Sequence, residues 1–250
     1  MNIKEAHNFY RKQFDMFKDI VDLSTPYIPH VEEIIEQVGR PFTTVLELGA
    51  GNGLLARSLS TFDKTITTVE LVPEMVEFAK NYQPSNVTSL CGSFYDIELK
   101  DTFDTVLYID GFGIGTDEEQ LTLLKRIYHW LKPEGVALID IYQPDYWKKV
   151  SGQRMRPFPN SKISRIYGYD ENLNRMTDTW WEDEHPDIKY TQSLKCYSPD
   201  EISALCSKAD LNVMAYSPGG AMDFEKWQFK NLVSLSECLS YRIKIKKAFS

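Results

Sequence analysis

Short apolar runs alternate with stretches of helical spacing between residues 43 and 141. We predict strands at residues 43–48, 65–70, 87–90, 105–109 and 136–141. Ahead of the last run, one helical face collects Leu121, Leu124, Ile127, Tyr128 and Leu131. Such spacing is typical of an amphipathic helix, and strands that alternate with helices indicate a parallel sheet with crossover helices.

Polar signals mark where these helices begin and end. Thr116 and Glu119 have the spacing of a capping box, and the Lys-Pro-Glu-Gly stretch at 132–135 is predicted to form the turn after that helix. Nearer the N-terminus, the first eighteen residues are predicted to be helical. A second apolar stripe, formed by Val31, Ile34, Ile35 and Val38, is closed by Gly39, a residue type that commonly ends helices.

The pattern changes after residue 141. Residues 142–197 are aromatic and rich in turns, with strand-like runs at 162–169, 175–181 and 188–197. A helix restarts at Ser198, where Pro199 and Glu201 complete a capping signal, and two more strands are predicted at 211–217 and 241–247. We therefore expect a small antiparallel cap over the carboxyl edge of the sheet, where open α/β sheets bind ligands.

The predicted fold class is α/β: a doubly wound, mostly parallel seven-stranded sheet with a small antiparallel β cap inserted after the fifth strand. The core would comprise residues 41–141 and 198–250, with N-terminal helices in 1–40 and the cap in 142–197. A chain of 250 residues, of which 42% are hydrophobic, has enough apolar surface to bury such a core.

The charge balance and the cysteines narrow the partners and the location. A formal net charge of −8 repels polyphosphate and argues against a nucleic-acid substrate. No apolar run approaches the ~20 residues that span a bilayer, and the N-terminus lacks the apolar block of a signal peptide. Because Cys91, Cys196, Cys206 and Cys238 form no CxxC pair, we expect reduced thiols in a cytoplasmic protein, with no metal site and no membrane partner.

A glycine-rich turn follows the first predicted strand. Glu47-Leu48 leads into Gly49-Ala50-Gly51-Asn52-Gly53, and a helical run starts at Leu54. Glycines permit a tight turn and let a ligand approach bare backbone. The dinucleotide fingerprint requires a small residue where Leu54 stands, and the Glu47 carboxylate would repel a pyrophosphate. The turn therefore favours a ligand with a cationic group and leaves a nicotinamide-dependent oxidoreductase as the weaker alternative.

Glu70 ends the next predicted strand, about twenty residues further on. An acidic side chain at this position can accept hydrogen bonds from both hydroxyls of a ribose. Hydrogen bonds to charged groups are worth about 1.5–3 kcal/mol each. Together, Glu47 and Glu70 indicate a ligand that carries both a cation and a ribose.

Five segments, in order and with the right spacing, resemble the motifs of class I S-adenosylmethionine-dependent methyltransferases. Residues 47–53 are similar to the first motif, 69–75 to the second and 92–94 to the third. Residues 103–113 resemble the motif of the fourth strand, and 131–135 resemble the turn before the fifth. The similarity spans about residues 43–141, and the chain from residue 198 onward resembles the closing helix and hairpin of the family.

The resemblance implies a binding site for S-adenosylmethionine, with S-adenosylhomocysteine as the product. Glu47 and the three glycines of the turn would lie under the methionine part, and Glu70 would bind the ribose. Asp110, just past the fourth strand, would face the methionine part or the acceptor. The helices of residues 1–40 would cover the cofactor from the other side, and Tyr10 in the first of them would contact it.

The adenine would lie between Leu71 and Met75, with the backbone of Phe94 near its amino group. Many family members have an acidic residue where this chain has Ser93. The complete set of expected cofactor contacts is Tyr10, Glu47, Gly49, Gly51, Gly53, Glu70, Leu71, Met75, Ser93, Phe94 and Asp110.

The leading function is methyl transfer to an O or N atom of a small molecule. Orientation supplies much of the acceleration, and a hydroxyl or ammonium acceptor must also lose a proton. Residues 110–113, Asp-Gly-Phe-Gly, match neither motif of the familiar DNA methyltransferases. His185, in the expected cap, is the candidate general base because its unperturbed pKa is about 6.5. A non-catalytic, S-adenosylmethionine-binding regulatory module is the alternative.

A basic stretch in the expected cap bears on the acceptor. No acidic residue interrupts the run that contains Lys148, Lys149, Arg154, Arg156, Lys162 and Arg165. The run indicates either a solvated loop or a positive patch, where Arg154 or Arg156 would grip an anionic acceptor as a planar fork. The aromatic residues of the cap either form its core or line a pocket for a planar acceptor.

Overall fold

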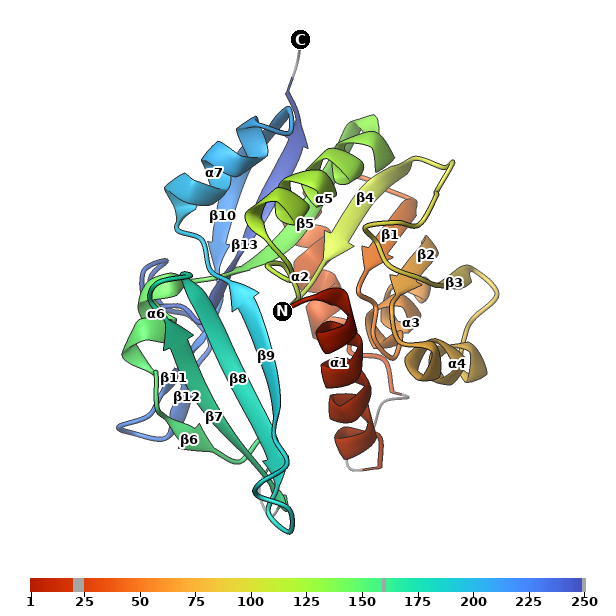
Figure 1. Cartoon of the computed structure of the whole chain (residues 1–250). Helices are drawn as coiled ribbons and strands as arrows, with labels where there is room; N and C mark the ends of the chain where they lie inside the picture. Colours follow the sequence, from red (N-terminus) through yellow and green to blue (C-terminus); the bar gives the residue numbers. More distant parts are fainter. Residues whose placement is uncertain (20–24, 159–160, 249–250) are drawn as a thin grey trace.

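A seven-stranded sheet forms the centre of the protein (Figure 1). The structure is a computed structural model that describes residues 1–19, 25–158 and 161–248. The strand order is β10-β13-β5-β4-β1-β2-β3, in which β1 to β5 are parallel and β13 is antiparallel to both of its neighbours. The bounds are β1 Thr44–Leu48, β2 Thr65–Glu70, β3 Val87–Cys91, β4 Phe103–Tyr108, β5 Leu131–Tyr142, β10 Leu211–Pro218 and β13 Ser240–Lys247. The predicted α/β class is confirmed.

Helices cover both faces of this sheet. On one face, α2 (Ile28–Val38) and α3 (Leu54–Ser60) bury their apolar sides in one core cluster. On the other face, α5 (Asp117–Trp130) and α7 (Pro199–Ser207) contribute to a second, larger cluster. Helix α4 (Pro73–Asn81) packs against β2 and β3. These two layers are the outcome that alternating strands and amphipathic helices predict.

The predicted helix ends are present. Thr116 and Glu119 form the capping box of α5, with the Glu119 N–H donating to Thr116 Oγ1 over 3.2 Å. Ser198 and Glu201 do the same at α7. Gly39 ends α2 with a φ of 66°, in the left-handed region that favours glycine.

Two local details differ from the expectation. Residues 132–135, predicted as a turn, lie within the bounds of β5 and bulge out of the ladder between the Phe103–Leu131 and Thr105–Val136 pairs. The pairing of β5 with β4 therefore begins at Leu131, directly after α5, rather than after a separate turn. On α5, Leu121 is only half-buried, because the face that meets the sheet is formed by Gln120, Leu123, Leu124, Ile127 and Trp130.

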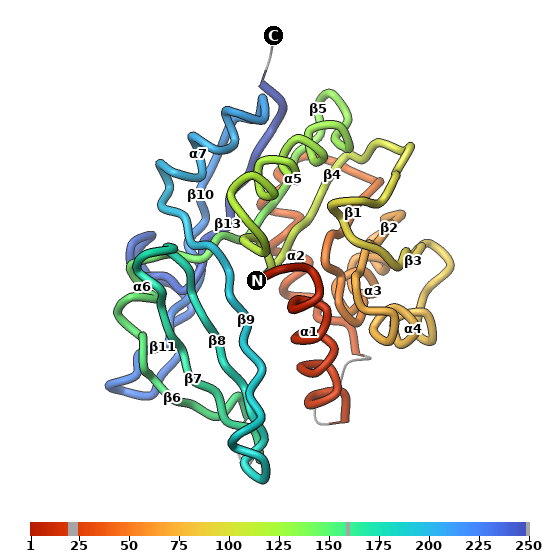
Figure 2. Tube along the Cα trace, viewed as in Figure 1, coloured from red at the N-terminus to blue at the C-terminus, as the bar shows by residue number. Residues whose placement is uncertain are grey.

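Residues between β5 and α7 form the expected antiparallel cap, and Figure 2 shows the chain leaving the core after β5 and returning before α7. The cap sheet has the order β6-β7-β8-β9 and is antiparallel throughout. Its bounds are β6 Arg154–Met155, β7 Ile163–Asp170, β8 Arg175–Glu182 and β9 Tyr190–Lys195. Sequence patterns missed the short helix α6 (Pro144–Lys149) and the hairpin of β11 (Ala221–Asp223) and β12 (Gln228–Lys230).

Most aromatic residues of the cap form its core. Trp147 is almost fully buried and meets the ring of Tyr167 edge-on, with 4.7 Å between the ring centroids. Tyr142, Tyr146 and Tyr197 are buried in the same cluster. The core interpretation of these rings therefore accounts for most of them without an aromatic acceptor.

Helix α1 (Ile3–Phe17) lies between the core and the cap, as Figures 1 and 2 show. It packs against α4 and β9, and Gln192 Nε2 of β9 donates to Tyr10 Oη over 2.9 Å. The other N-terminal helix does not share this position. Helix α2 packs with the α3 side of the sheet, so of the two expected covering helices only α1 lies beside the cap.

Helices long and apolar enough to cross a membrane are absent from the part of the chain that the structure describes. All four cysteines are free, with Cys91 exposed and the other three buried. Non-covalent packing therefore holds the described fold together.

Asp104, at the start of β4, joins three segments of the core. Its Oδ2 accepts the N–H groups of Thr43 and Thr44 over 3.0 and 2.9 Å, and its Oδ1 lies 2.9 Å from Lys132 Nζ. Desolvation opposes ionisation, but the hydrogen bonds from Thr44 and Lys132 outweigh it and hold the pKa of Asp104 well below its ordinary value.

We expect Asp104→Asn to lower the free energy of unfolding by about 1.5–3 kcal/mol at neutral pH, because charge-assisted hydrogen bonds are lost. A depressed pKa contributes stability above the unfolded value of about 3.9, and this contribution disappears as the pH falls. The difference between wild type and variant should therefore shrink below a pH of about 4. Urea denaturation measures it, with exposed Asp101→Asn as the control; a difference that persists in acid would contradict the argument.

Candidate cofactor site

A cavity lies at the carboxyl ends of β1, β2 and β4, and α1 forms its opposite wall. Ile3, Ala6 and Tyr10 line it from α1. Nine of the eleven expected cofactor contacts line it: Tyr10, Gly49, Gly51, Glu70, Leu71, Met75, Ser93, Phe94 and Asp110. The sheet edge thus brings together side chains from separate motifs, as the position of ligand sites in open α/β sheets predicts.

The glycine turn fits closely between neighbouring segments. Gly51 and Gly53 have φ values of 56° and 73°, which residues other than glycine rarely adopt. A Cβ on Gly53 would lie 2.9 Å from Ala79 Cβ of α4, closer than real contacts allow. Gly53 is therefore a packing residue at the start of α3 and does not line the cavity, unlike Gly49 and Gly51.

Glu70 stabilises the glycine turn through its side chain. Its Oε2 accepts the Gly51 N–H and its Oε1 accepts the Val72 N–H, each over 2.8 Å. Burial raises the pKa of Glu70, against the effect of these backbone hydrogen bonds. Each carboxylate oxygen keeps a further lone pair, so the residue that organises the turn can also accept ribose hydroxyls at the cavity wall.

Glu47 lies behind the turn rather than in the cavity wall. It is buried, and its Oε2 has no hydrogen-bond partner among the described residues. Burial, reinforced by the nearby Glu70, raises the pKa of Glu47 to about 8. A buried carboxylate oxygen without a donor fits a cationic ligand on the other side of the turn, which supports the expected methionine end of the cofactor.

Asp110 follows β4 in a left-handed conformation, with a φ of 57°. Such a backbone is uncommon for residues other than glycine, and Asp tolerates it better than most. Its side chain is exposed to the cavity and accepts a hydrogen bond from the Tyr142 hydroxyl. Desolvation by the surrounding protein raises the pKa of Asp110 to about 6, although the Tyr142 hydrogen bond acts in the opposite direction.

These residues fit the cofactor that the motifs imply. Glu70 offers acceptors for a ribose, Leu71 and Met75 offer apolar contacts at the cavity wall, and Ser93 and Phe94 complete that wall. Glu47 supplies a buried carboxyl oxygen without a donor near the turn, and a cationic ligand beside it would favour its ionised form. The two expected contacts that do not line the cavity are Glu47, which is buried at the end of β1, and Gly53, the N-cap of α3.

His185 is not part of this site. It is exposed in the connection between β8 and β9 and does not line the cavity. Its N–H donates to Glu182 O over 2.9 Å within the same turn. The expectation rested on the intrinsic pKa of histidine alone, and this placement argues against His185 as the general base.

The basic stretch of the cap is largely paired with acidic residues that follow it in the chain. Arg156 lies 2.6 Å from Asp183, and Lys162 lies 2.5 Å from Glu184. Arg154 is exposed on β6 and does not line the cavity. The patch expected to receive an anionic acceptor is therefore mostly neutralised.

One member of the stretch instead reaches the interior of the cap. Arg165 Nε lies 3.0 Å from Asp178 Oδ1 in a buried ion pair, and its guanidinium stacks on the ring of Trp180, 4.3 Å from the centroid. Asp178 and Gln192 are opposite each other in the β8–β9 ladder. The buried polar group of the cap went unrecognised because its members meet only when the cap strands pair, and alternation along β8 and β9 was the available signal. Tyr142, the last residue of β5, went unassigned to Asp110 because no spacing rule joins the ends of β4 and β5 at the level of side chains.

Comparison with known proteins agrees with this geometry. Residues 45–135 match a family model described as a methyltransferase domain. An uncharacterised methyltransferase from Bacillus cytotoxicus is 31% identical over 134 residues, which cover 52% of this chain and 63% of that protein. A relative from Bacillus mycoides is 29% identical with the same coverage. The chain thus spans less than two thirds of the length of the curated relatives it matches.

Solved structures align with most of the length of this chain. The CcbJ methyltransferase from Streptomyces caelestis has a TM-score of 0.75 at 16% identity, covering 96% of this chain and 98% of that one. An amino pentose methyltransferase from Micromonospora echinaspora, bound to S-adenosylmethionine, has a TM-score of 0.64 at 17% identity and covers 98% and 97%. The glycopeptide N-methyltransferase MtfA has a TM-score of 0.60 at 17% identity and covers 91% of each chain. At these identities the likeness shows the fold.

Glu70→Ala should weaken the binding of S-adenosylmethionine about ten- to a hundredfold, because the ribose loses charged acceptors worth about 1.4–2.8 kcal/mol. Isothermal titration calorimetry measures the affinity. Glu77→Ala, on the exposed side of α4, is the matched control and should bind like the wild type. An unchanged affinity in a folded Glu70→Ala protein would remove Glu70 from the site.

Glu47→Gln should stabilise the ligand-free protein at alkaline pH. A folded-state pKa of about 8, above the ordinary 4.5, means that stability falls as the pH rises between those values. Glutamine removes this cost, so the variant should melt above the wild type at a pH of about 8, by about 2–4 °C per kcal/mol relieved. The two curves should converge at pH 4.5, whereas S-adenosylmethionine affinity should be lower in the variant. Equal melting temperatures at both pH values would contradict the burial argument.

Proposed function

We propose that this chain, whose residues 45–135 match a methyltransferase-domain family model, is a class I S-adenosylmethionine-dependent methyltransferase that transfers a methyl group to an O or N atom of a small molecule. The observation that carries this proposal is the position of Asp110. A carboxylate with a raised pKa stands at the cavity wall, beside the buried hydroxyl of Tyr142. A proton acceptor next to a cofactor cavity is what catalysis requires and simple cofactor binding does not.

Residues of the core would hold the cofactor and residues of α1 and the cap would enclose it. Glu70 would bind the ribose, Leu71 and Met75 would contact the adenine, and Glu47 would stabilise the cationic end. When bound, S-adenosylmethionine supplies an electrophilic methyl group on its sulfonium. Ile3, Ala6 and Tyr10 of α1 would exclude water from the cavity, which strengthens the electrostatic interactions inside.

Asp110 would act as the general base. Its Oδ atoms would take the proton that the acceptor N–H or O–H loses when the new bond to carbon forms. Tyr142 would hold the carboxylate in place by donating its hydroxyl hydrogen to Oδ1. A pKa of about 6 leaves the carboxylate mostly ionised at neutral pH, so that it is ready to accept a proton.

A nitrogen acceptor fits this site better than an anionic one. Asp110 has no cation among its hydrogen-bond partners in the described chain, and the buried Arg165 is already paired with Asp178. An ammonium or amine group would supply the missing positive charge or donor. Two similar structures are named an amino pentose methyltransferase and a glycopeptide N-methyltransferase, and the second name specifies transfer to nitrogen. Neutralisation of the cap's basic run leaves little support for a carboxylate or phosphate on the acceptor.

The same charge pattern bears on macromolecular partners and location. A formal net charge of −8, with several residues of the basic stretch committed to internal ion pairs, is electrostatically unfavourable for binding a polyphosphate. We therefore propose a small-molecule acceptor and no nucleic-acid partner. The four cysteines are free, as is usual in a reducing compartment, and we also propose action in the cytoplasm without a membrane partner. Incubation of the protein with labelled S-adenosylmethionine and pools of amines and alcohols, read by mass spectrometry, tests the activity. Tight cofactor binding with no transfer to any pool would favour the non-catalytic module.

Asp110→Asn should lower kcat by about 10²–10⁴-fold, the usual contribution of a general base. In the wild type, kcat should rise with pH through about 6, where Asp110 loses its proton, and then level off. The variant should lack this step. His185→Gln, in the exposed β8–β9 connection, is the control and should retain the wild-type profile. If cofactor affinity falls as steeply as kcat, Asp110 holds the cofactor and is not the base.

A further inference from the structure

The loop after β4, residues 109–116, carries Asp110 and forms part of the cavity wall. Core side chains bind its backbone from one side. The Tyr108 hydroxyl donates to Gly111 O over 2.7 Å, and the Gly113 N–H donates to Gln120 Oε1 over 3.2 Å. The loop is therefore anchored to β4 and α5.

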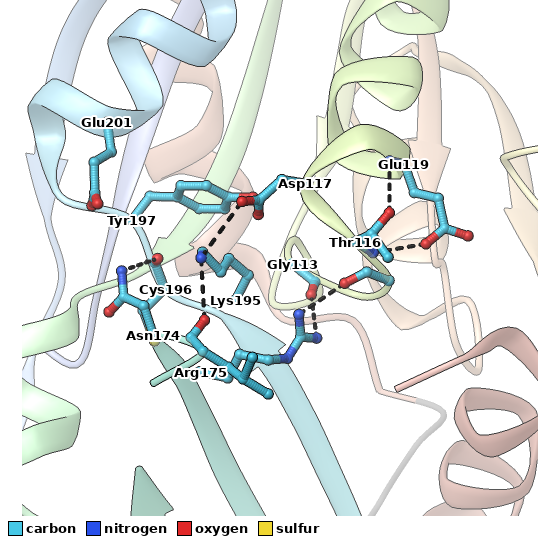
Figure 3. Close-up of polar contacts among 12 residues, drawn as sticks. Gly113, Thr116, Asp117, Glu119, Asn174, Arg175, Lys195, Cys196, Tyr197 and Glu201 are labelled. Carbon is cyan, nitrogen blue, oxygen red and sulfur yellow. Dashed lines mark hydrogen bonds and ion pairs between the residues drawn. The ribbon is translucent and has the colours of Figure 1, made fainter. Parts of the chain in front are cut away.

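The cap binds the same loop from the other side through Arg175, the first residue of β8. Its Nη1 donates to Gly115 O over 2.8 Å and its Nη2 donates to Gly113 O over 2.9 Å. Ser193 of β9 holds the guanidinium in this orientation, accepting from Nε at Oγ over 3.0 Å and from Nη2 at its carbonyl over 2.8 Å. Figure 3 shows the guanidinium pointing from the cap toward Gly113. One side chain thus joins two strands of the cap to two carbonyls of the loop.

The backbones of the loop and the cap are also in direct contact. Gly113 has a φ of 111°, and a Cβ there would lie 2.5 Å from Lys195 O of β9. The Lys195 N–H donates to Gly113 O over 2.9 Å. Loop and cap backbones therefore touch at this point, and a shift of the cap would carry the loop with it.

This arrangement is costly for stability. Arg175 is 8% exposed, and its hydrogen-bond partners in the described chain are carbonyls and a hydroxyl, with no carboxylate among them. A buried cation without a directly bonded anion is unfavourable compared with an apolar residue of similar volume. What the guanidinium offers instead is a rigid fork that can hold two carbonyls at a fixed separation.

We infer that Arg175 is a positioning residue, which couples the seating of the cap to the place of Asp110 by holding the carbonyls of Gly113 and Gly115. The inference rests on the proposed role of Asp110 as the base. It makes the cap more than a cover: when the cap is seated, the loop is fixed, and Asp110 faces the cavity beside Tyr142.

Arg175→Lys tests the coupling, because lysine keeps the charge but cannot hold both carbonyls and Ser193 at once. NMR titration of ¹³C-labelled aspartate, with the Asp110 signal assigned through Asp110→Asn, reports the pKa of that carboxyl without any acceptor. A loosened loop admits water, so the pKa of Asp110 should fall from about 6 toward its ordinary value of 3.8. S-adenosylmethionine affinity should fall about three- to tenfold, because the same loop lines the cavity.

Lys195→Gln is the matched control at the same interface. The Lys195 side chain contacts Asp117 and Leu173 O, at 3.6 and 3.1 Å, and touches neither loop carbonyl. This variant should keep both the Asp110 pKa and the affinity of the wild type. A folded Arg175→Lys protein with wild-type values, or a Lys195→Gln protein with the same losses, overturns the inference.

Ser193→Ala provides the second variant should Arg175→Lys fail to fold. It removes only the hydroxyl that accepts the Nε–H of Arg175, so a smaller shift of the Asp110 pKa in the same direction is expected, and no shift overturns the inference. Failure of the proposed function has a different signature. If Asp110→Asn transfers methyl groups as fast as the wild type, Asp110 is not the base, whatever the NMR titration of the loop variants shows.

Discussion

The carboxylate of Glu70 is the interaction on which the site depends. Parallel pairing sets Leu48 of β1 beside Val69 of β2, so the glycine turn after β1 begins next to the residue that ends β2. Glu70 then accepts the N–H groups of Gly51 and Val72 and satisfies donors that a tight turn would otherwise leave bare. The register of β1 and β2 therefore places Glu70 where it can stabilise the glycine turn and also line the cavity. A single buried acid thus serves both the fold and the site.

The edge of an open sheet forms only one wall of such a site. Here the opposite wall comes from distant parts of the chain. Tyr10 of α1 lines the cavity, and Gln192 of the cap donates a hydrogen bond to the hydroxyl of that tyrosine. Asp110 lies near the point where core, α1 and cap converge, with the Tyr142 hydroxyl on its Oδ1. Enclosure raises the pKa of the acid, so the surroundings that exclude water also adjust the acid toward the range that a base needs at neutral pH.

The sequence predicted what is local and periodic. Each strand of the seven-stranded sheet was predicted from an apolar run bounded by turn residues. In the capping boxes of α5 and α7, the two residues of each pair are only three positions apart in the sequence. The resemblance to methyltransferase motifs selected nine residues that line the cavity, at the edge where the strand ends of a parallel sheet converge. The contacts between Tyr10 and Gln192 and between Gly113 and Arg175 join residues 182 and 62 positions apart in the sequence, and no spacing rule predicts contacts over such separations. His185 was proposed as the general base because of its residue type alone, and the residue type does not indicate where the side chain lies in the fold.

Buried charge recurs throughout this region, and stability does not explain it. Among the residues that the structure describes, Glu47 has an oxygen without a donor, Glu70 is buried with backbone hydrogen-bond partners, and Arg175 is buried with no carboxylate among its hydrogen-bond partners. Each costs free energy in the ligand-free protein. A ligand that brings a cation and hydroxyl groups to the cavity would repay part of that cost, and by linkage it would stabilise the fold by the same free energy with which it binds. Affinity and stability are then two measures of the same unsatisfied groups, which is why these residues, rather than the well-packed strands beneath them, identify the site.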